Sequence, residues 1–146
     1  MKSKFIDAYM DVAQRFAQLS HAKRLQVGAI IVKDDRIISI GYNGMPTGWD
    51  NCCEHTLQHH ELGTCTTVSK TEVLHAETNA IAKLAKSGES GLGATMFVTH
   101  TPCIDCAKLV YQSGITTVYY KNEYRSTQGL EFLNKSGVEV IHHHKL

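Results

Sequence analysis

The sequence predicts a three-layer α/β/α domain built on a five-stranded mixed β-sheet. β-Branched runs alternate with amphipathic helical segments from residue 72 to residue 141, a pattern typical of strands joined by right-handed helical crossovers. Two more β-branched runs near residue 30 flank a turn signal and predict an antiparallel hairpin. The 146 residues suit one domain with one core, so we assign residues 1–146 to a single domain.

The first part of the chain contributes one helix and this hairpin. Apolar residues recur at helical spacing over residues 3–19, which predicts an amphipathic helix. Residues 27–32 and 37–40 are the two β-branched runs, and a pair of aspartates between them indicates a tight turn. Residues 41–48 are rich in glycine, asparagine and proline, so the second strand is expected to end in a loop there.

Residues 49–70 show no clear hydrophobic period, and we predict a long inserted loop that holds at most a short helix. A long loop in a compact domain is usually functional or mobile. The segment is rich in residues that can bind metal, namely Cys52, Cys53, His55, His59, His60 and Cys65.

Helices and strands alternate through the rest of the chain. Helical spacing begins near Glu72 and is stopped by a Ser-Gly pair at residues 87–88. Thr101 and Pro102 predict the start of the next helix, with threonine as its N-cap and proline at its first position. We also expect strands at 95–99, 115–120 and 138–141, and a last helix at 126–135.

Charge and composition exclude several classes of protein. The formal net charge of +1 gives no strongly basic field for a long nucleic acid, although a small anion needs only a local cationic cluster. No segment reaches the length of a membrane span. Asp7 and Asp11 interrupt what would be the apolar part of a signal peptide. We therefore expect a cytoplasmic protein with no membrane partner, whose five cysteines are metal ligands or free thiols.

The most informative pattern is His75-Ala76-Glu77 followed by Pro102-Cys103-Ile104-Asp105-Cys106. His75, Cys103 and Cys106 are ligands that zinc prefers, and catalytic zinc sites use three protein ligands and leave one position for water. Both half-motifs fall at expected helix starts, where the helix dipole favours thiolates. Glu77 is not needed as a ligand and can move protons between water, a ring nitrogen and a leaving amine. The composite pattern is the signature of zinc-dependent nucleobase deaminases.

A structural zinc site is the alternative interpretation. Cys-x-x-Cys pairs are common in such sites, and Cys52, Cys53 or Cys65 could supply a fourth ligand. A structural site, however, gives no reason for Glu77 or for a proline at the start of the second half-motif. The catalytic interpretation is therefore favoured.

From about Arg24 to Val140 the chain resembles the deoxycytidylate deaminases of the cytidine deaminase superfamily. Residues 51–55, Asn-Cys-Cys-Glu-His, are similar to a loop of T-even phage members, which favours a phage or viral origin. The other segments that carry the resemblance are Lys23-Arg24-Leu25-Gln26-Val27-Gly28-Ala29, Gly41-Tyr42-Asn43-Gly44-Met45-Pro46, His75-Ala76-Glu77-Thr78-Asn79-Ala80-Ile81 and Thr101-Pro102-Cys103-Ile104-Asp105-Cys106-Ala107.

The resemblance implies zinc-dependent hydrolysis of dCMP to dUMP and ammonia, which supplies thymidylate synthesis. Glu77 is then the catalytic residue and His75, Cys103 and Cys106 are the zinc ligands. The resemblance also implies a homo-oligomer, commonly a hexamer, that dCTP activates and dTTP inhibits. Mg²⁺ would accompany the triphosphate effectors.

Four positions become candidates for substrate binding through the same resemblance. Asn43 matches an asparagine that holds the sugar, and the alternative is a plain turn residue. Arg24, with Lys23 beside it, is a candidate for the phosphate, and a solvated cationic pair is the alternative. Tyr120 and Arg125 follow the fourth strand, where family members close over the substrate.

Effector binding is expected at a further set of residues. Lys83 and Lys86 stand where phage relatives have effector-responsive residues including an arginine, so positive charge is kept but the planar guanidinium is lost. Ordinary solvated lysines are the alternative. The set is Lys23, Gly44, Met45, Thr47, Lys83 and Lys86.

Phage relatives also carry a second, structural zinc. Residues 20–23 replace the first-helix cysteine of that pattern, so free thiols and surface histidines are the favoured interpretation here. Candidate ligands for a second zinc are Cys52, Cys53, His55, His59, His60, Cys65 and Glu72.

Two alternatives to a dCMP deaminase stay open. One is the same chemistry on dCTP, cytidine, tRNA or single-stranded DNA, although nucleic-acid deaminases need a basic channel and a flipped base. The other is a zinc-stabilised module that senses nucleotides without turnover.

Overall fold

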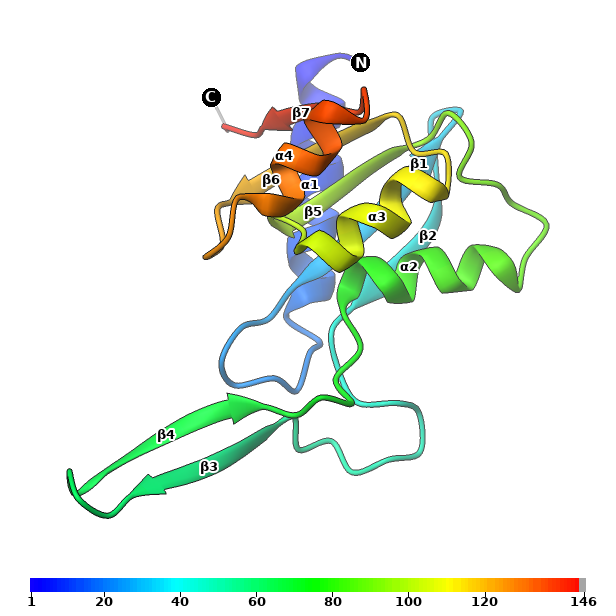
Figure 1. Cartoon of the computed structure of the whole chain (residues 1–146). Helices are drawn as coiled ribbons and strands as arrows, with labels where there is room; N and C mark the ends of the chain where they lie inside the picture. The colour runs from blue at the N-terminus through cyan, green and yellow to red at the C-terminus, as the bar shows by residue number, and fades with distance from the viewer. Residues whose placement is uncertain (145–146) are drawn as a thin grey trace.

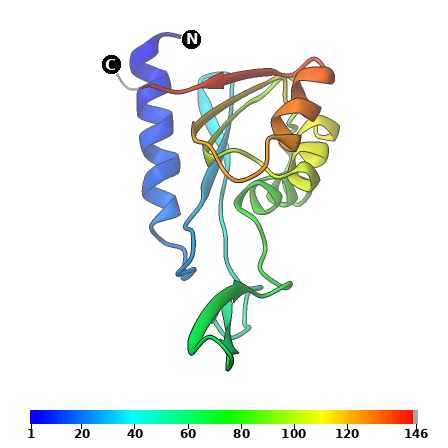
Figure 2. The same ribbon diagram turned by 60° about the vertical axis from the view of Figure 1, so that its left-hand side comes forward.

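The computed structural model describes residues 1–144 and confirms the three-layer α/β/α architecture. One five-stranded sheet has the order β2-β1-β5-β6-β7. Helix α1 covers one face of this sheet, and α2, α3 and α4 cover the other (Figures 1 and 2). The helices and the strands of this sheet are α1 (Ser3–Ala17), β1 (Gly28–Lys33), β2 (Arg36–Tyr42), α2 (Ala76–Ala85), β5 (Thr95–His100), α3 (Ile104–Gln112), β6 (Thr117–Asn122), α4 (Gln128–Lys135) and β7 (Glu139–His142).

The sheet is mixed, as predicted. β1 pairs antiparallel with β2 and with β5, whereas β5, β6 and β7 run parallel. Asp34 and Asp35 have φ angles of 52° and 58°, the left-handed conformation of a tight hairpin turn between β1 and β2. Among residues 1–144, no helix is long and apolar enough to cross a membrane.

Strand β1 separates two apolar cores. Ala29 and Ile31 pack toward α2, α3 and α4, whereas Ile30 and Val32 pack with Met10 of α1. Helices on both faces explain why this strand reads as a continuous apolar run instead of an alternating one.

Helix α2 lies directly on β2 at Gly41. A Cβ atom on Gly41 would meet the backbone carbonyl of Ala76 and would lie 2.6 Å from the backbone nitrogen of Ala80. Only glycine allows this approach, which fixes the first turn of α2 against the sheet.

Gly41→Ala is therefore expected to destabilise the protein by about 3 kcal/mol, because the methyl group forces two backbones apart. Urea unfolding measures the change. Gly88→Ala is the control, because a Cβ atom there meets nothing within 4 Å, and it should shift the free energy of unfolding by less than about 0.5 kcal/mol. Equal effects of the two substitutions would contradict the close-approach argument.

The prediction of a loop at residues 49–70 is wrong for most of the segment. The segment forms a second, two-stranded sheet of β3 (Glu54–His59) and β4 (Thr64–Ser69), connected through Gly63 at φ 63°. This hairpin, which we call the arm, projects away from the five-stranded sheet (Figures 1 and 2). Nearly all of its residues are exposed on both faces. Because neither face packs on a core, its sequence does not alternate between apolar and polar residues.

Two helix starts also differ from the predictions. Helix α2 begins at Ala76 instead of near Glu72, because residue 74 is held extended by a bridge to Gly44. Helix α3 begins at Ile104 with Cys103 as its N-cap, so the assignment of Thr101 as N-cap and Pro102 as first helical residue is wrong. The Thr101 hydroxyl instead accepts a hydrogen bond from the backbone N–H of Tyr124.

Candidate active site

Three potential metal ligands meet where α2 and α3 begin. His75 is the N-cap of α2 and Cys103 the N-cap of α3, with Cys106 in the first turn of α3. Nδ1 of His75 lies 3.3 Å from Sγ of Cys106 and 3.6 Å from Sγ of Cys103. The donor atoms of the three residues lie within 4.8 Å of one another, a spacing that suits a single four-coordinate ion with one position left open.

The ionisation of these groups fits a divalent cation. The pKa of the Cys103 thiol is lowered to about 3, mainly by hydrogen bonds from Cys106 and then from His75. The pKa of the Cys106 thiol is raised, because it donates to Cys103 and because it is buried. A cation between two thiols this close favours the ionised form of both, and two thiolates with one imidazole are among the ligand sets of catalytic zinc sites.

Glu77 lies in the first turn of α2 and is only 4% exposed. Burial raises the pKa of its carboxyl group to about 7, although a hydrogen bond with Cys106 and the charge of His75 act in the opposite direction. A carboxyl group with this pKa can both accept and release a proton near neutral pH.

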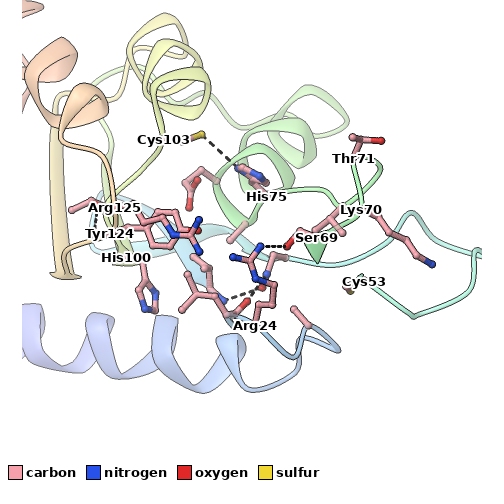
Figure 3. A pocket seen from close by; sticks show the side chains of 18 residues that line it. Arg24, Cys53, Ser69, Lys70, Thr71, His75, His100, Cys103, Tyr124 and Arg125 are labelled. Carbon is pink, nitrogen blue, oxygen red and sulfur yellow. Dashed lines mark hydrogen bonds between the residues drawn. The ribbon is translucent and has the colours of Figure 1, made fainter. Parts of the chain in front are cut away.

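The ligand cluster opens into a cavity of about 460 Å³, a size typical of small-molecule sites. Its lining includes His75, Glu77 and Cys103 as well as Arg24 and Arg125. Figure 3 labels His75, Cys103, Arg24 and Arg125 around it. Glu77 is the one carboxylate in the part of the lining that the structure describes. The cavity is therefore locally cationic, although the whole chain is almost neutral.

Asn43 lines this cavity and holds the segment before β1. Its Oδ1 accepts from the backbone N–H of Val27 at 2.9 Å, and its Nδ2 donates to the carbonyl of Leu25 at 2.8 Å. These bonds leave one N–H and one lone pair of the amide for a ligand. The residue is thus more than a turn former.

Tyr120 does not line the cavity. It lies on β6 in the apolar core and stacks on His142 with ring centroids 4.8 Å apart. β6 continues to Asn122, so the residue that follows the strand and faces the cavity is Tyr124, next to Arg125. The guanidinium carbon of Arg125 lies 5.7 Å from the centre of the Tyr124 ring.

Sequence reasoning also missed Lys70 and His100, which line the same cavity (Figure 3). Lys70 follows the arm, and its backbone N–H donates to the carbonyl of Cys53 at 2.8 Å. Burial lowers the pKa of His100, and its Nδ1 lies 2.9 Å from Oγ1 of Thr99. His100 directly precedes Thr101 and Pro102 of the second half-motif, and this position could have identified it as a residue near the site.

The expected effector residues lie outside the cavity lining. Lys83 donates from Nζ to the carbonyl of Ile40 on β2, and Lys86 is the C-cap of α2. Gly44 pairs with Leu74. The remaining members of the set are Lys23, Met45 and Thr47, of which Lys23 and Thr47 are exposed.

Among residues 1–144, His75, Cys103 and Cys106 are the one group of three or more potential ligands close enough to share a metal. Cys53 is buried, whereas Cys52 and Cys65 are exposed. Burial raises the pKa of the Cys53 thiol, which disfavours the ligating form.

Comparisons with known proteins agree with this geometry. The family model of the cytidine and deoxycytidylate deaminase zinc-binding region matches residues 3–122, a span that includes both half-motifs. The crystal structure of dCMP deaminase from cyanophage S-TIM5, in complex with dCMP and dUMP, has a TM-score of 0.88 and 46% identity and covers 98% of this chain and 99% of that chain.

Two curated relatives are also similar to most of this chain. Deoxycytidylate deaminase of Enterobacteria phage T4 is 34% identical over 167 residues, with 90% of this chain and 86% of the relative covered. ComE operon protein 2 of Bacillus subtilis (strain 168) is 38% identical over 136 residues, with 90% and 67% covered. With the matched family model and the ligand cluster at two helix starts, these similarities show that the chain belongs to the cytidine and deoxycytidylate deaminase family.

Proposed function

We propose that this protein is a zinc-dependent hydrolase that converts dCMP and water to dUMP and ammonia and thereby supplies thymidylate synthesis. The observation that carries the proposal is one cavity that joins His75, Glu77 and Cys103 to the cations Arg24 and Arg125. A cytosine ring needs the first group of residues and a 5′-phosphate needs the second. The cyanophage relative in complex with dCMP and dUMP supports this substrate.

In the proposed mechanism, His75, Cys103 and Cys106 would hold a zinc ion. A zinc ion held there would supply a water of lowered pKa as the nucleophile for C4 of the cytosine ring. The Glu77 carboxylate accepts a proton from the attacking water and returns it to ring nitrogen N3, and then assists protonation of the departing amine. Its burial keeps bulk water away from this proton exchange.

Substrate binding is assigned to residues around the same cavity. Asn43 holds the deoxyribose with the amide groups that its bonds to Leu25 and Val27 leave free. Arg24 and Arg125 bind the phosphate. Tyr124, and not Tyr120, closes over the substrate, because Tyr124 lines the cavity.

A substrate panel tests the function. Ammonia release is expected from dCMP, with dCTP raising and dTTP lowering the rate, and with much slower release from cytidine and from a cytosine-containing oligonucleotide. The purified protein with one equivalent of zinc is the sample. An inert protein, with and without dCTP, would refute the proposal, and activity on the oligonucleotide alone would replace dCMP by nucleic acid.

Regulation and assembly belong to the same proposal. The effectors dCTP and dTTP bind with Mg²⁺ near Lys23, Gly44, Met45, Thr47, Lys83 and Lys86. The enzyme acts in the cytoplasm, that of the host if a phage encodes it. The exposed apolar side chains Leu57, Leu62 and Val68 on the arm support a homo-oligomer, a hexamer in this proposal, because an isolated two-stranded hairpin is marginally stable in water.

A further inference from the structure

Arg24 is bound through both its backbone and its side chain by the root of the arm, the cross-strand pair of Glu54 and Ser69. Oε2 of Glu54 accepts hydrogen bonds from the backbone N–H groups of Lys23, at 2.9 Å, and of Arg24, at 3.2 Å. Nη1 of Arg24 donates to Oγ of Ser69 at 3.4 Å (Figure 3). Glu54 and Ser69 face each other as the first cross-strand pair of β3 and β4, so one pair of residues fixes both the backbone and the guanidinium of Arg24.

Arg24 depends on these contacts for its position. Residues 21–27 form neither helix nor strand, so no regular backbone ladder orders this segment. A side chain on such a segment loses conformational entropy when it binds a ligand, unless other bonds already order it. Glu54 and Ser69 make such bonds to Arg24, so the side chain is already ordered when a ligand binds.

Glu54 is unusual for the arm because it is buried, only 9% exposed, whereas the rest of β3 is exposed. Burying a carboxylate is costly unless hydrogen bonds compensate it, and here two backbone amides do so. Among residues 1–144, Glu54 makes no ion pair within 4.0 Å, so it does not neutralise the guanidinium of Arg24. Of the five N–H donors of the guanidinium, the Ser69 bond uses one, and the others stay available to an anion in the cavity.

We propose that Glu54 is a positioning residue that sets Arg24 for the 5′-phosphate of the substrate, so the root of the arm determines how well a nucleoside monophosphate binds. The inference rests on the proposed dCMP deaminase function. It assigns Glu54 to binding and not to the chemical step, because Glu77 and the metal ligands lie on α2 and α3, which Glu54 does not contact through any of its hydrogen bonds.

The test is a double-mutant cycle on the zinc-loaded protein with Glu54→Ala, Arg24→Ala and the double variant. Glu54→Ala is expected to raise KM for dCMP about tenfold and to change kcat less than about twofold. Because Glu54 acts through Arg24, the double variant should bind dCMP no worse than Arg24→Ala alone. Inhibition by dUMP should weaken in the same proportion, whereas inhibition by deoxyuridine, which lacks the phosphate, should not change.

Three further variants separate positioning from folding. Glu54→Gln should restore most of the affinity, because its amide oxygen can accept the same two backbone N–H groups. Ser69→Ala leaves Glu54 intact and should raise KM by a few-fold, since it removes only the guanidinium contact. Glu61→Ala, in the exposed turn of the arm, is the matched control and should match the wild type.

Additive losses in the cycle, an equal loss of deoxyuridine inhibition, or a fall in kcat without a change in KM would overturn the positioning role. These outcomes require an active wild-type enzyme. A wild-type protein inert on dCMP would instead refute the proposed function, and the inference with it. If Glu54→Ala does not fold, Ser69→Ala still decides. A normal KM for dCMP in this variant, or an equal rise in its inhibition constant for deoxyuridine, would contradict the proposal.

Discussion

Glu77→Gln is expected to lower kcat for dCMP roughly 10³- to 10⁴-fold while the protein keeps its zinc. Glutamine has nearly the same shape as glutamate and can occupy the same buried position in the first turn of α2. It cannot accept a proton from water or deliver one to the ring, so the loss should fall on the chemical step. Steady-state ammonia release gives kcat, and metal analysis of the same sample gives the zinc content.

Glu131→Gln provides the control for this substitution. Glu131 is also an acidic residue in the first turn of a helix, but it is exposed on α4 and outside the cavity lining. It should have wild-type kcat. If Glu77→Gln kept more than about a tenth of the wild-type kcat, the proton transfer assigned to Glu77 would be wrong. If it lost zinc, Glu77 would act on the metal site and not on the substrate.

The chemical part of the site was predictable because its residues are local in sequence. His75 and Glu77 are two residues apart, and Cys103 and Cys106 are three apart, so each pair needs only a helix start to take up its geometry. The error at Thr101 and Pro102 shows the limit of this reasoning. Propensity placed the N-cap two residues early, because the Thr101 hydroxyl is used by a tertiary contact with Tyr124 that no local pattern reveals.

The binding part of the site was harder to predict because it is assembled by tertiary structure. Ser69 and Lys70 line the cavity because the arm brings them there. The strands of the arm are exposed and lack the alternation of apolar and polar residues from which a strand is predicted. Tyr120 was preferred to Tyr124 since the end of β6 was placed at residue 120 and not at Asn122. A shift of a few residues at a strand end is enough to exchange a core tyrosine for a cavity tyrosine.

The second large effect is expected for Cys106→Ser. Cys106 is buried between α2 and α3, and serine replaces a thiolate with a hydroxyl that is a poor zinc ligand. The variant should retain less than about a tenth of the wild-type zinc and should lose activity to the level of chelated wild-type protein. Its thermal midpoint should no longer respond to added zinc, because a metal stabilises only the state that binds it. Metal analysis, ammonia release and thermal unfolding with and without zinc measure these effects.

Cys53→Ser separates this result from the general loss of a buried thiol. Cys53 lines the same cavity and is only 1% exposed, but it lies outside the ligand cluster, and burial raises the pKa of its thiol. We expect one zinc per chain in the wild type and in Cys53→Ser, and almost none in Cys106→Ser. Two zinc ions per wild-type chain, one of them lost in Cys53→Ser, would show that the loop before the arm binds a second metal. Full zinc retention in Cys106→Ser would contradict the ligand set from which the whole mechanism is built.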